Sequence, residues 1–336
     1  MWYRFASNFR KENFLTQKLA MNTQYPQESL FFQPWHEDGL IKDDEGNPKV
    51  LYHGSLSPNI KSFDLSKMDP QSYFGRAIYT TDNPDDSNDN YSNPLSPDWS
   101  GKVGNLADKY SKEDEEKDRN DEYFQSDQPP ARLRAEDEII NQAKPNTTPL
   151  YGRMKNPAYL FKEKTPRNQI FEMYNYDEES EEYIESEGDK ILSELEDLLY
   201  EEGYGPEYHI VEEGLRKVRE ELGDEFTLFE LQQAIRNSLN LYDYDIEIGD
   251  FLQKLIQNLG YDGIIMDADQ YWKTLVDRPT KHYVFFEPSQ VKSPFNKTFD
   301  PQSSILNASS GIFKKIFGGD QASMLNSMFD GSSNTS

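Results

Sequence analysis

The segment KVLYHGS, at residues 49–55, indicates how the fold begins, because it has the composition of a short strand that ends at a glycine. A turn-forming stretch, DDEGNP at 43–48, comes directly before it. Gly54 would let a ligand approach the backbone closely, and His53 could hydrogen-bond a hydroxyl group of that ligand. The alternative for His53 is a structural histidine whose hydrogen bonds are satisfied within the fold.

Further short strands are expected on both sides of a long helical region. The sequence YFGRAIYT, at 73–80, is a glycine turn that leads into a second strand. Other strands are expected at 150–154, 263–266 and 282–286. Strands before and after a helical block predict an α+β fold.

Between residues 178 and 259 the apolar residues recur at helical spacing. The expected stripes consist of Ile184, Ile191, Leu195, Leu198 and Leu199; of Leu215, Val218 and Leu222; and of Phe251, Leu255, Ile256 and Leu259. The sequence TLFE, at 227–230, is a capping box that begins one of these helices, and Gly260 ends the last one. We interpret the acidic residues between the stripes as solvated helix faces.

The chain divides by composition into an arm, one large domain and a tail. The expected boundaries are an N-terminal arm at 1–29, a domain at 30–301 with a flexible insertion at 82–148 and an acidic helical block at 178–259, and a low-complexity tail at 302–336. Within the insertion, a helix is expected from Ala131 to Ala143.

The composition excludes several classes of function. The net charge of −26 disfavours non-specific binding to nucleic acid, and we expect no nucleic-acid partner. Cysteine is absent, which excludes disulfides and thiolate metal sites, and no metal site is expected. No apolar run is long enough for a membrane span, and the first residues do not resemble a secretory signal peptide.

Two tyrosines are candidates for binding a flat ring. Tyr91 follows Tyr79 by twelve residues, and two such side chains could hold a heteroaromatic ring between them. Packing of both rings in the protein core is the alternative, because tyrosine side chains are often simply buried.

Three segments resemble, in the same order, the three motifs of the diphtheria-toxin and poly(ADP-ribose) polymerase branch of ADP-ribosyltransferases. These segments are LYHGS at 51–55, FGRAIY at 74–79 with Asn90 and Tyr91 behind it, and HYVFFEPSQVK at 282–292. The chain is more similar still to the polyvalent proteins of phages and conjugative elements. The matching features are Trp35, DEGNP at 44–48, YHG at 52–54, KNP at 155–157, YDGII at 261–265 and TFDP at 298–301. Together they span about residues 30–301.

The resemblance implies a split β-sheet core that binds NAD, as a substrate, in a cleft between two small sheets. It implies that His53 hydrogen-bonds the adenosine ribose and that the Gly54 backbone holds the nicotinamide amide. Ser55 would assist at that amide. Tyr79 would stack on the nicotinamide, with Tyr91 on its opposite face.

One catalytic position departs from the family pattern. The family's glutamate, which binds the nicotinamide ribose and favours an oxocarbenium-like transition state, falls on His282. Ala77 and Thr80 also replace usual residues, and we expect both changes to be tolerated. Glu287 is an odd five residues further along the strand and would lie on its opposite face, so it should not substitute. We therefore expect His282→Glu to raise nicotinamide release.

The resemblance then predicts an NAD-dependent mono-ADP-ribosyltransferase with Tyr79 and His282 as catalytic residues. It would modify a host protein, be encoded by a phage or mobile element, and act in the host cytoplasm or in a virion, with virion proteins as further partners. Loss of the glutamate excludes chain elongation and leaves mono-transfer, NAD hydrolysis or binding alone. The alternative is a non-catalytic NAD-binding-fold protein that serves as a virion or interaction component. The acceptor protein is not specified by these residues.

Overall fold

The structure is a computed structural model, and it describes most of the chain between residues 32 and 306. The described residues are 32–57, 60–94, 96, 99–120, 129–161, 170–173, 175–177, 182–201, 208–239, 246–268, 279–296 and 299–306. The expected N-terminal arm at 1–29 lies outside them, as do residues 307–336 of the expected tail.

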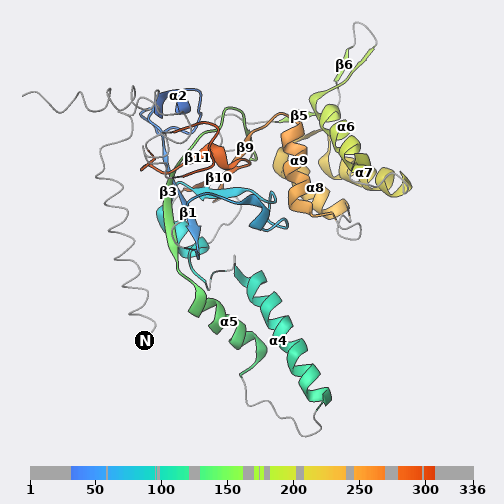
Figure 1. Cartoon of the computed structure of the whole chain (residues 1–336). Coiled ribbons are helices and arrows are strands. Elements are labelled where there is room, and N and C mark those ends of the chain that lie inside the picture. Colours follow the sequence, from blue (N-terminus) through green and yellow to red (C-terminus); the bar gives the residue numbers. More distant parts are fainter. Residues whose placement is uncertain are drawn as a thin grey trace, which may run out of the picture.

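A seven-stranded mixed sheet lies at the centre of the molecule (Figure 1), in the order β11-β3-β1-β2-β10-β9-β4. Its strands are β1 (Val50–Ser55), β2 (Ile78–Thr81), β3 (Asn146–Gly152), β4 (Pro157–Tyr159), β9 (Gly263–Asp267), β10 (Lys281–Phe285) and β11 (Val291–Lys292). The β4–β9 pair is parallel, and the other neighbours are antiparallel. The expected strands are therefore present, and together with the helices they confirm the α+β class.

The sheet is continuous, but its two halves meet at a narrow joint. β1 pairs with β3 at six positions and β10 pairs with β2 at four, whereas β1 pairs with β2 only where Tyr52 faces Thr81. Two separate small sheets were expected, and one sheet with a weak β1–β2 joint is found. Beyond this pair, the His53 side chain bonds the Tyr79 carbonyl and links the strands by a side chain rather than by backbone pairing.

Alternate residues of the central strands supply two hydrophobic cores, one on each face of the sheet. Ile264 and Met266 of β9 belong to the larger core, together with Val284 of β10. Ile265 and Tyr283, which point the other way, belong to the second core. Continuously apolar strands such as β9 are typical of strands covered on both faces.

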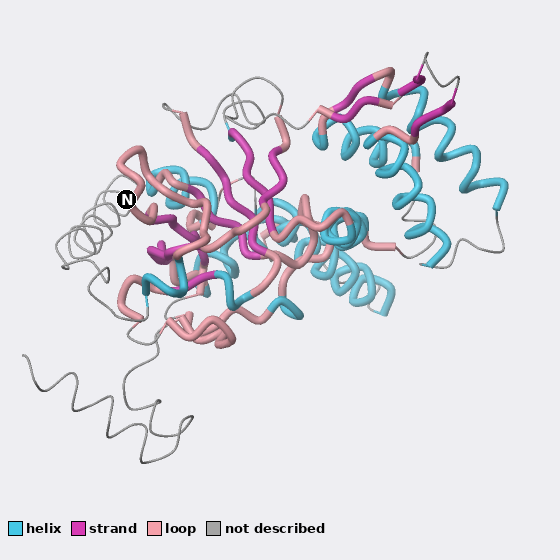
Figure 2. Tube along the Cα trace, turned by 90° about the horizontal axis from the view of Figure 1, so that it is seen from above, coloured by secondary structure: helices cyan, strands magenta, loops and turns pink. Residues whose placement is uncertain are grey.

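The larger core is completed by a block of four helices that lies to one side of the sheet (Figures 1 and 2). These helices are α6 (Glu187–Leu199), α7 (Tyr208–Leu222), α8 (Leu228–Ser238) and α9 (Ile248–Asn258). Small strands accompany them: β5 (Phe171–Glu172), β6 (Asn175–Asp177), β7 (Glu182–Ile184) and β8 (Glu225–Phe226). Ile184 was expected in the first helix but lies in β7, because Ser186 caps α6 and fixes its start.

The sequence signals at the ends of these helices are confirmed. Thr227 accepts a hydrogen bond from the Glu230 backbone while the Glu230 carboxylate bonds the Thr227 backbone, which is a complete capping box. Gly260 follows α9 with a φ of 88°, in the left-handed region that glycine adopts without strain.

Among its described residues, the segment expected to be a flexible insertion, 82–148, contains four helical elements. They are α3 (Pro84–Asp86), the π-helical turn η3 (Ser87–Tyr91), α4 (Ser100–Asn120) and α5 (Ala131–Gln142). The expected helix at 131–143 is confirmed, whereas α4 was not predicted because its sequence is mostly polar. α4 pairs with α5, where Arg134 stacks on Tyr110 and forms an ion pair with Asp114. This hairpin projects away from the sheet (Figure 1).

The segments at both ends of the described chain pack against the sheet. α2 (Phe32–His36) forms an aromatic cluster in which Phe32 and Trp35 contact Phe299. The Leu306 backbone N–H donates to the Lys61 carbonyl, so the first residues of the expected tail belong to the folded body. Among the described helices, none is long and apolar enough to cross a membrane.

Candidate functional site

The residues expected to form the site come from β1, β2, η3 and β10. Tyr52, Thr81 and His282 lie side by side across β1, β2 and β10, so their side chains share one face of the sheet. The antiparallel registers place the first and last of these residues on either side of Thr81, although 230 positions separate them in the sequence. The site therefore lies at the weak β1–β2 joint.

His53 closes this joint from the opposite face. Its Nδ1 lies 2.8 Å from the Tyr79 carbonyl oxygen, and its ring packs edge-on against Phe63 with the centroids 4.8 Å apart. Because a carbonyl can only accept, Nδ1 must carry the hydrogen and donate it. Burial lowers the pKa of His53, while the hydrogen bond to the Tyr79 backbone opposes that shift. The neutral ring thus fastens β1 to β2.

Gly54 is approached closely, but by the protein's own chain. A β-carbon at this position would lie 2.5 Å from the Tyr91 β-carbon and would also collide with the Ser87 carbonyl oxygen. The glycine therefore lets η3 lie directly against β1. The buried hydroxyl of Ser87 has no hydrogen-bond partner within the described part of the chain.

Ser55 has a local structural contact. Its hydroxyl accepts a hydrogen bond from the Ser57 backbone N–H at 3.0 Å, which shapes the turn that follows β1. The hydroxyl is partly exposed and stands one residue beyond the contact between Gly54 and η3.

Tyr79 is held by the glycine turn that precedes it. Its hydroxyl donates to the Gly75 carbonyl at 3.0 Å and accepts from the Phe74 N–H at 2.9 Å. Burial raises the pKa of Tyr79 well above its usual value, so the hydroxyl stays protonated. This glycine turn is also bound to the helical block, because the Asp250 carboxylate of α9 accepts hydrogen bonds from both the backbone N–H and the guanidinium of Arg76.

Tyr91 and His282 are in direct contact. The Tyr91 hydroxyl lies 3.3 Å from Nδ1 of His282, and the two rings meet edge to face at a centroid distance of 5.7 Å. The Tyr91 carbonyl also accepts a hydrogen bond from the Trp99 indole at 3.0 Å. The two residues that the resemblance places on the nicotinamide side are thus brought together by η3 and β10.

Sequence reasoning did not identify Asp86, which is the closest charged partner of His282. One carboxylate oxygen of Asp86 lies 2.7 Å from Nε2 of His282, and both side chains are buried. The other oxygen accepts from the Asn90 amide at 2.7 Å. Burial alone would raise the pKa of Asp86, but hydrogen bonds from His282, Asn90 and Thr81 together hold it below its usual value. Asp86 is therefore ionised near neutral pH.

The sequence does contain a local signal for the element that carries Asp86. Asn83 caps α3, with Pro84 in the first turn, which is a common way to begin a helix. This pattern could have predicted a turn directly after β2. It could not have shown that Asp86 faces His282, because that contact depends on the pairing of β2 with β10.

The other departures from the family pattern are accommodated by the fold. Ala77 is buried, and the buried Thr80 hydroxyl donates to the Tyr283 carbonyl at 3.1 Å. Glu287 lies exposed just beyond the end of β10, so it is not placed beside His282. The expectation that Glu287 does not replace the missing glutamate agrees with this position.

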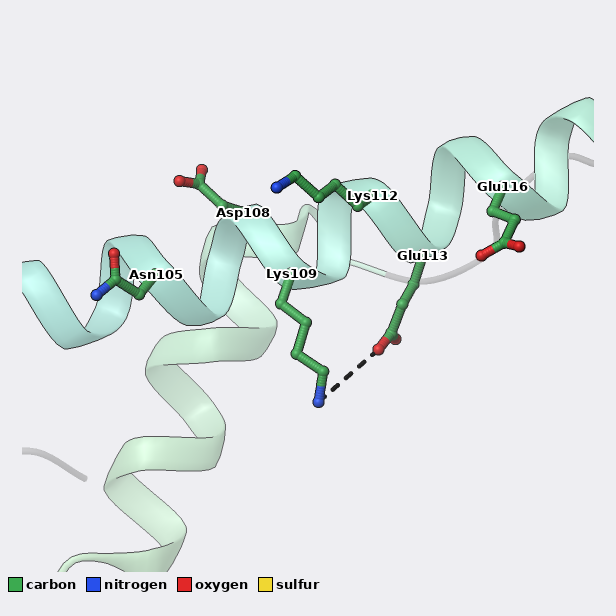
Figure 3. A pocket seen from close by; sticks show the side chains of 6 residues that line it. All are labelled: Asn105, Asp108, Lys109, Lys112, Glu113 and Glu116. Atoms are coloured by element: carbon green, nitrogen blue, oxygen red, sulfur yellow. Dashed lines mark ion pairs between the residues drawn. The ribbon is translucent and has the colours of Figure 1, made fainter. Parts of the chain in front are cut away.

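A separate pocket lies on the projecting hairpin and offers no comparable chemistry. Figure 3 shows its lining side chains, which all come from α4: Asn105, Asp108, Lys109, Lys112, Glu113 and Glu116. They include charges of both signs along one helix face, and Lys109 pairs with Glu113 at 3.9 Å. This arrangement is typical of a solvated helix face.

The site therefore combines a buried carboxylate–imidazole pair with a tyrosine hydroxyl, and Gly54 lies against the residue that carries this hydroxyl. In the described residues, no group of three or more metal-ligating side chains is found. A carboxylate, an imidazole and a hydroxyl that are hydrogen-bonded one to the next can transfer a proton, as in general acid–base catalysis. No protein-family model, curated protein or solved structure matches this chain.

Proposed function

We propose that this chain is an NAD-dependent mono-ADP-ribosyltransferase with a divergent ADP-ribosyltransferase fold. The observation that supports this proposal is the chain of contacts that links the motif residues across the β1–β2 joint. His53 bonds the Tyr79 backbone, Gly54 contacts Tyr91, and Tyr91 contacts His282. These residues come from three motifs that resemble the family's NAD-binding motifs, and they meet at the joint of a sheet whose halves are barely paired.

The residues present at the joint fit a nicotinamide group in two respects. Ser87 of η3, whose backbone carbonyl lies against Gly54, carries a buried hydroxyl that has no hydrogen-bond partner within the described residues and whose hydrogen-bonding capacity an amide would satisfy. Tyr91 supplies a partly exposed ring beside His282. Because η3 lies directly against one face of Gly54, the nicotinamide ring is proposed to bind at the partly exposed ring of Tyr91, beside His282, with η3 in place.

The proposed acceptor of the ADP-ribosyl group is a host protein. The enzyme would then be encoded by a phage or mobile element and would act in the host cytoplasm or from a virion. The strongly acidic chain suits a protein partner better than nucleic acid. The family's glutamate is replaced by His282, and this removes a carboxylate that would stand directly beside the developing cation. We therefore propose single transfer or hydrolysis at a slow rate.

The decisive experiment incubates the full chain with labelled NAD and host-cell lysate and measures protein labelling and free nicotinamide separately. Wild type should release nicotinamide and label protein, and His282→Ala should lose both. His36→Phe is the matched control, because His36 is a buried histidine of the α2 aromatic cluster. Saturating NAD should also stabilise the fold, by about 2.7 kcal/mol at a hundredfold excess over Kd. If NAD neither stabilises the fold nor is cleaved to release nicotinamide, the proposal is contradicted.

A non-catalytic NAD-binding protein is the second candidate, and one observation favours it. Both ring nitrogens of His282 already face protein groups, with Asp86 on one side and Tyr91 on the other. A histidine held in this way could have a structural role alone, which is to connect β10 to α3 and η3. In that case NAD would raise the melting temperature, but no nicotinamide would be released by wild type.

A further inference from the structure

The contact between Asp86 and His282 has the geometry of a carboxylate that orients a base. Asp86 is 2 % exposed and His282 is 5 % exposed, so water hardly competes for their hydrogen bond. At 2.7 Å the bond has the length typical of a charge-assisted contact. The resemblance marks no carboxylate at this place.

The hydrogen-bond partners of Asp86 determine which nitrogen of His282 carries the hydrogen. An ionised carboxylate can only accept, so Nε2 of His282 must donate to Asp86. In the neutral ring Nδ1 is then the accepting nitrogen, and it lies 3.3 Å from the Tyr91 hydroxyl, which can donate to it. The Asn90 amide and the Thr81 hydroxyl hold the carboxylate in place.

We propose that Asp86 is a positioning residue that holds His282 in the Nε2-protonated form, so that Nδ1 takes up a proton through the Tyr91 hydroxyl. This inference rests on the proposed function, and it adds a residue and a substrate class to it. Of the three hydrogen-bonded residues Asp86, His282 and Tyr91, Tyr91 is partly exposed and Asp86 is buried.

With an acceptor that carries a hydroxyl group, every bond and proton of the transfer step is accounted for. When the bond between ribose C1′ and the nicotinamide nitrogen breaks, its electron pair leaves with neutral nicotinamide. The acceptor oxygen bonds to C1′ and gives its proton to the Tyr91 oxygen, while Tyr91 gives its own proton to Nδ1 of His282. The imidazolium formed is then compensated by the Asp86 carboxylate at 2.7 Å.

The acceptor class follows from this step. A base is needed only where the acceptor loses a proton as it attacks, as a serine, threonine or tyrosine hydroxyl or a water molecule does. A carboxylate acceptor is already deprotonated and gains nothing from Nδ1. The proposed acceptor is therefore a hydroxyl-bearing side chain or water.

The tautomer of His282 can be measured without NAD. In the ¹⁵N-labelled full chain, long-range ¹⁵N–¹H spectra should show His282 with hydrogen on Nε2 and a bare Nδ1, with the signals assigned from His282→Gln. In Asp86→Asn, the oxygen should stay toward the Asn90 amide and the new amide group should face Nε2. That amide donates, so the hydrogen should move to Nδ1. Hydrogen on Nδ1 in wild type, or an unchanged tautomer in Asp86→Asn, would overturn the proposal.

The kinetics of nicotinamide release and of label transfer test whether Asp86 and Tyr91 take part in the proton transfer. Asp86→Asn should lower kcat by about a hundredfold or more with little change in KM, because proton transfer contributes about 10²–10⁴-fold. Tyr91→Phe should also lower kcat while the His282 tautomer stays unchanged. Asp85→Asn is the matched control, since it removes the same charge from the exposed neighbour in α3.

The outcomes separate the inference from the function on which it rests. Asp86→Asn with wild-type kcat, or label found mainly on carboxylates, would overturn the inference while leaving the transferase proposal intact. The expected tautomer without nicotinamide release by wild type would refute the proposed function and the proton transfer, but would support Asp86 as the residue that sets the His282 tautomer.

Discussion

Tyr52 of β1 faces Thr81 of β2, and this is the single registered pair between two strands that the structure describes in full. Near this pair, β1 and β2 are otherwise connected through side chains. The His53 ring bridges to the Tyr79 carbonyl, and η3 packs over Gly54. Changes at these side chains should therefore affect the joint more than the sheet as a whole.

Removal of the His53 ring should destabilise the fold. His53→Ala removes the hydrogen bond to Tyr79 and the edge contact with Phe63, and it should lower the free energy of unfolding by about 2–3 kcal/mol in urea titrations.

The effect of His53→Ala should also depend on pH. Burial holds the pKa of folded His53 below its usual 6.5, so the folded protein binds less proton than the unfolded chain as pH falls below that value. Wild type therefore loses stability from this group on acidification, and the variant should lose less between pH 7.5 and 5.5. Equal losses in the two proteins would show that His53 is not buried as described.

Two glycines provide a matched test of close packing. Gly54→Ala places a β-carbon against η3 and should cost about 1–3 kcal/mol, because neither backbone can retreat without strain. Gly104→Ala in α4, where nothing lies within 4 Å of a β-carbon, should instead stabilise by about 0.5–1 kcal/mol. Thermal melts of both variants measure the difference. A harmless Gly54→Ala would mean that η3 does not lie on β1.

The Tyr79 hydroxyl and ring should have separable roles. Tyr79→Phe removes only the bonds to Phe74 and Gly75, so it should lower the unfolding free energy by about 0.5–1.5 kcal/mol and leave NAD-dependent stabilisation largely intact. Tyr79→Ala removes the ring as well and should abolish that stabilisation. Similar NAD-dependent shifts in both variants would assign Tyr79 to the core alone.

Restoring the family's glutamate should require a second change. Sequence reasoning alone predicts that His282→Glu raises nicotinamide release. The structure places the ionised Asp86 beside this position, and two adjacent carboxylates repel, so one must take up a proton. His282→Glu alone should therefore give little gain.

The double variant Asp86→Asn with His282→Glu relieves this repulsion and should release nicotinamide faster than His282→Glu. Nicotinamide release by the four proteins of this cycle is the measurement. Additive effects of the two substitutions would contradict the contact between positions 86 and 282.

Lys292 in β11 should make stability depend on alkaline pH. Burial lowers the pKa of this lysine from 10.5 to about 8, although Asp300 opposes the shift, and its ammonium donates to the Ser303 carbonyl. Between about pH 8 and 10.5 the unfolded chain holds the proton that the folded protein has released, so stability rises with pH, by roughly 3 kcal/mol at most.

Urea titrations from pH 7.5 to 10.5 test this expectation. The rise should be smaller in Lys292→Met than in wild type, whereas Lys61→Met, at an exposed lysine, should retain it. The same pH dependence in all three proteins would show that Lys292 is exposed to water in the folded state.

Local features of the fold could be predicted from the sequence, because they depend on neighbouring residues. The capping box at Thr227 and Glu230 and the glycine stop at Gly260 are made within one or two turns of helix. The short strands follow from runs of apolar residues between turns. Helix α4 was missed, since its polar sequence is stabilised by α5 rather than by its own pattern.

What the sequence by itself determined is which residues resemble the three motifs and where their strands lie. Tertiary structure alone decided the contact between Asp86 and His282 and the atoms that the ring nitrogens of His53 and His282 face. The reason is physical: a histidine's tautomer is set by the atoms its nitrogens face. For His282 those atoms belong to Asp86 and Tyr91, 196 and 191 positions away, which only the pairing of β2 with β10 brings within 2.7 and 3.3 Å.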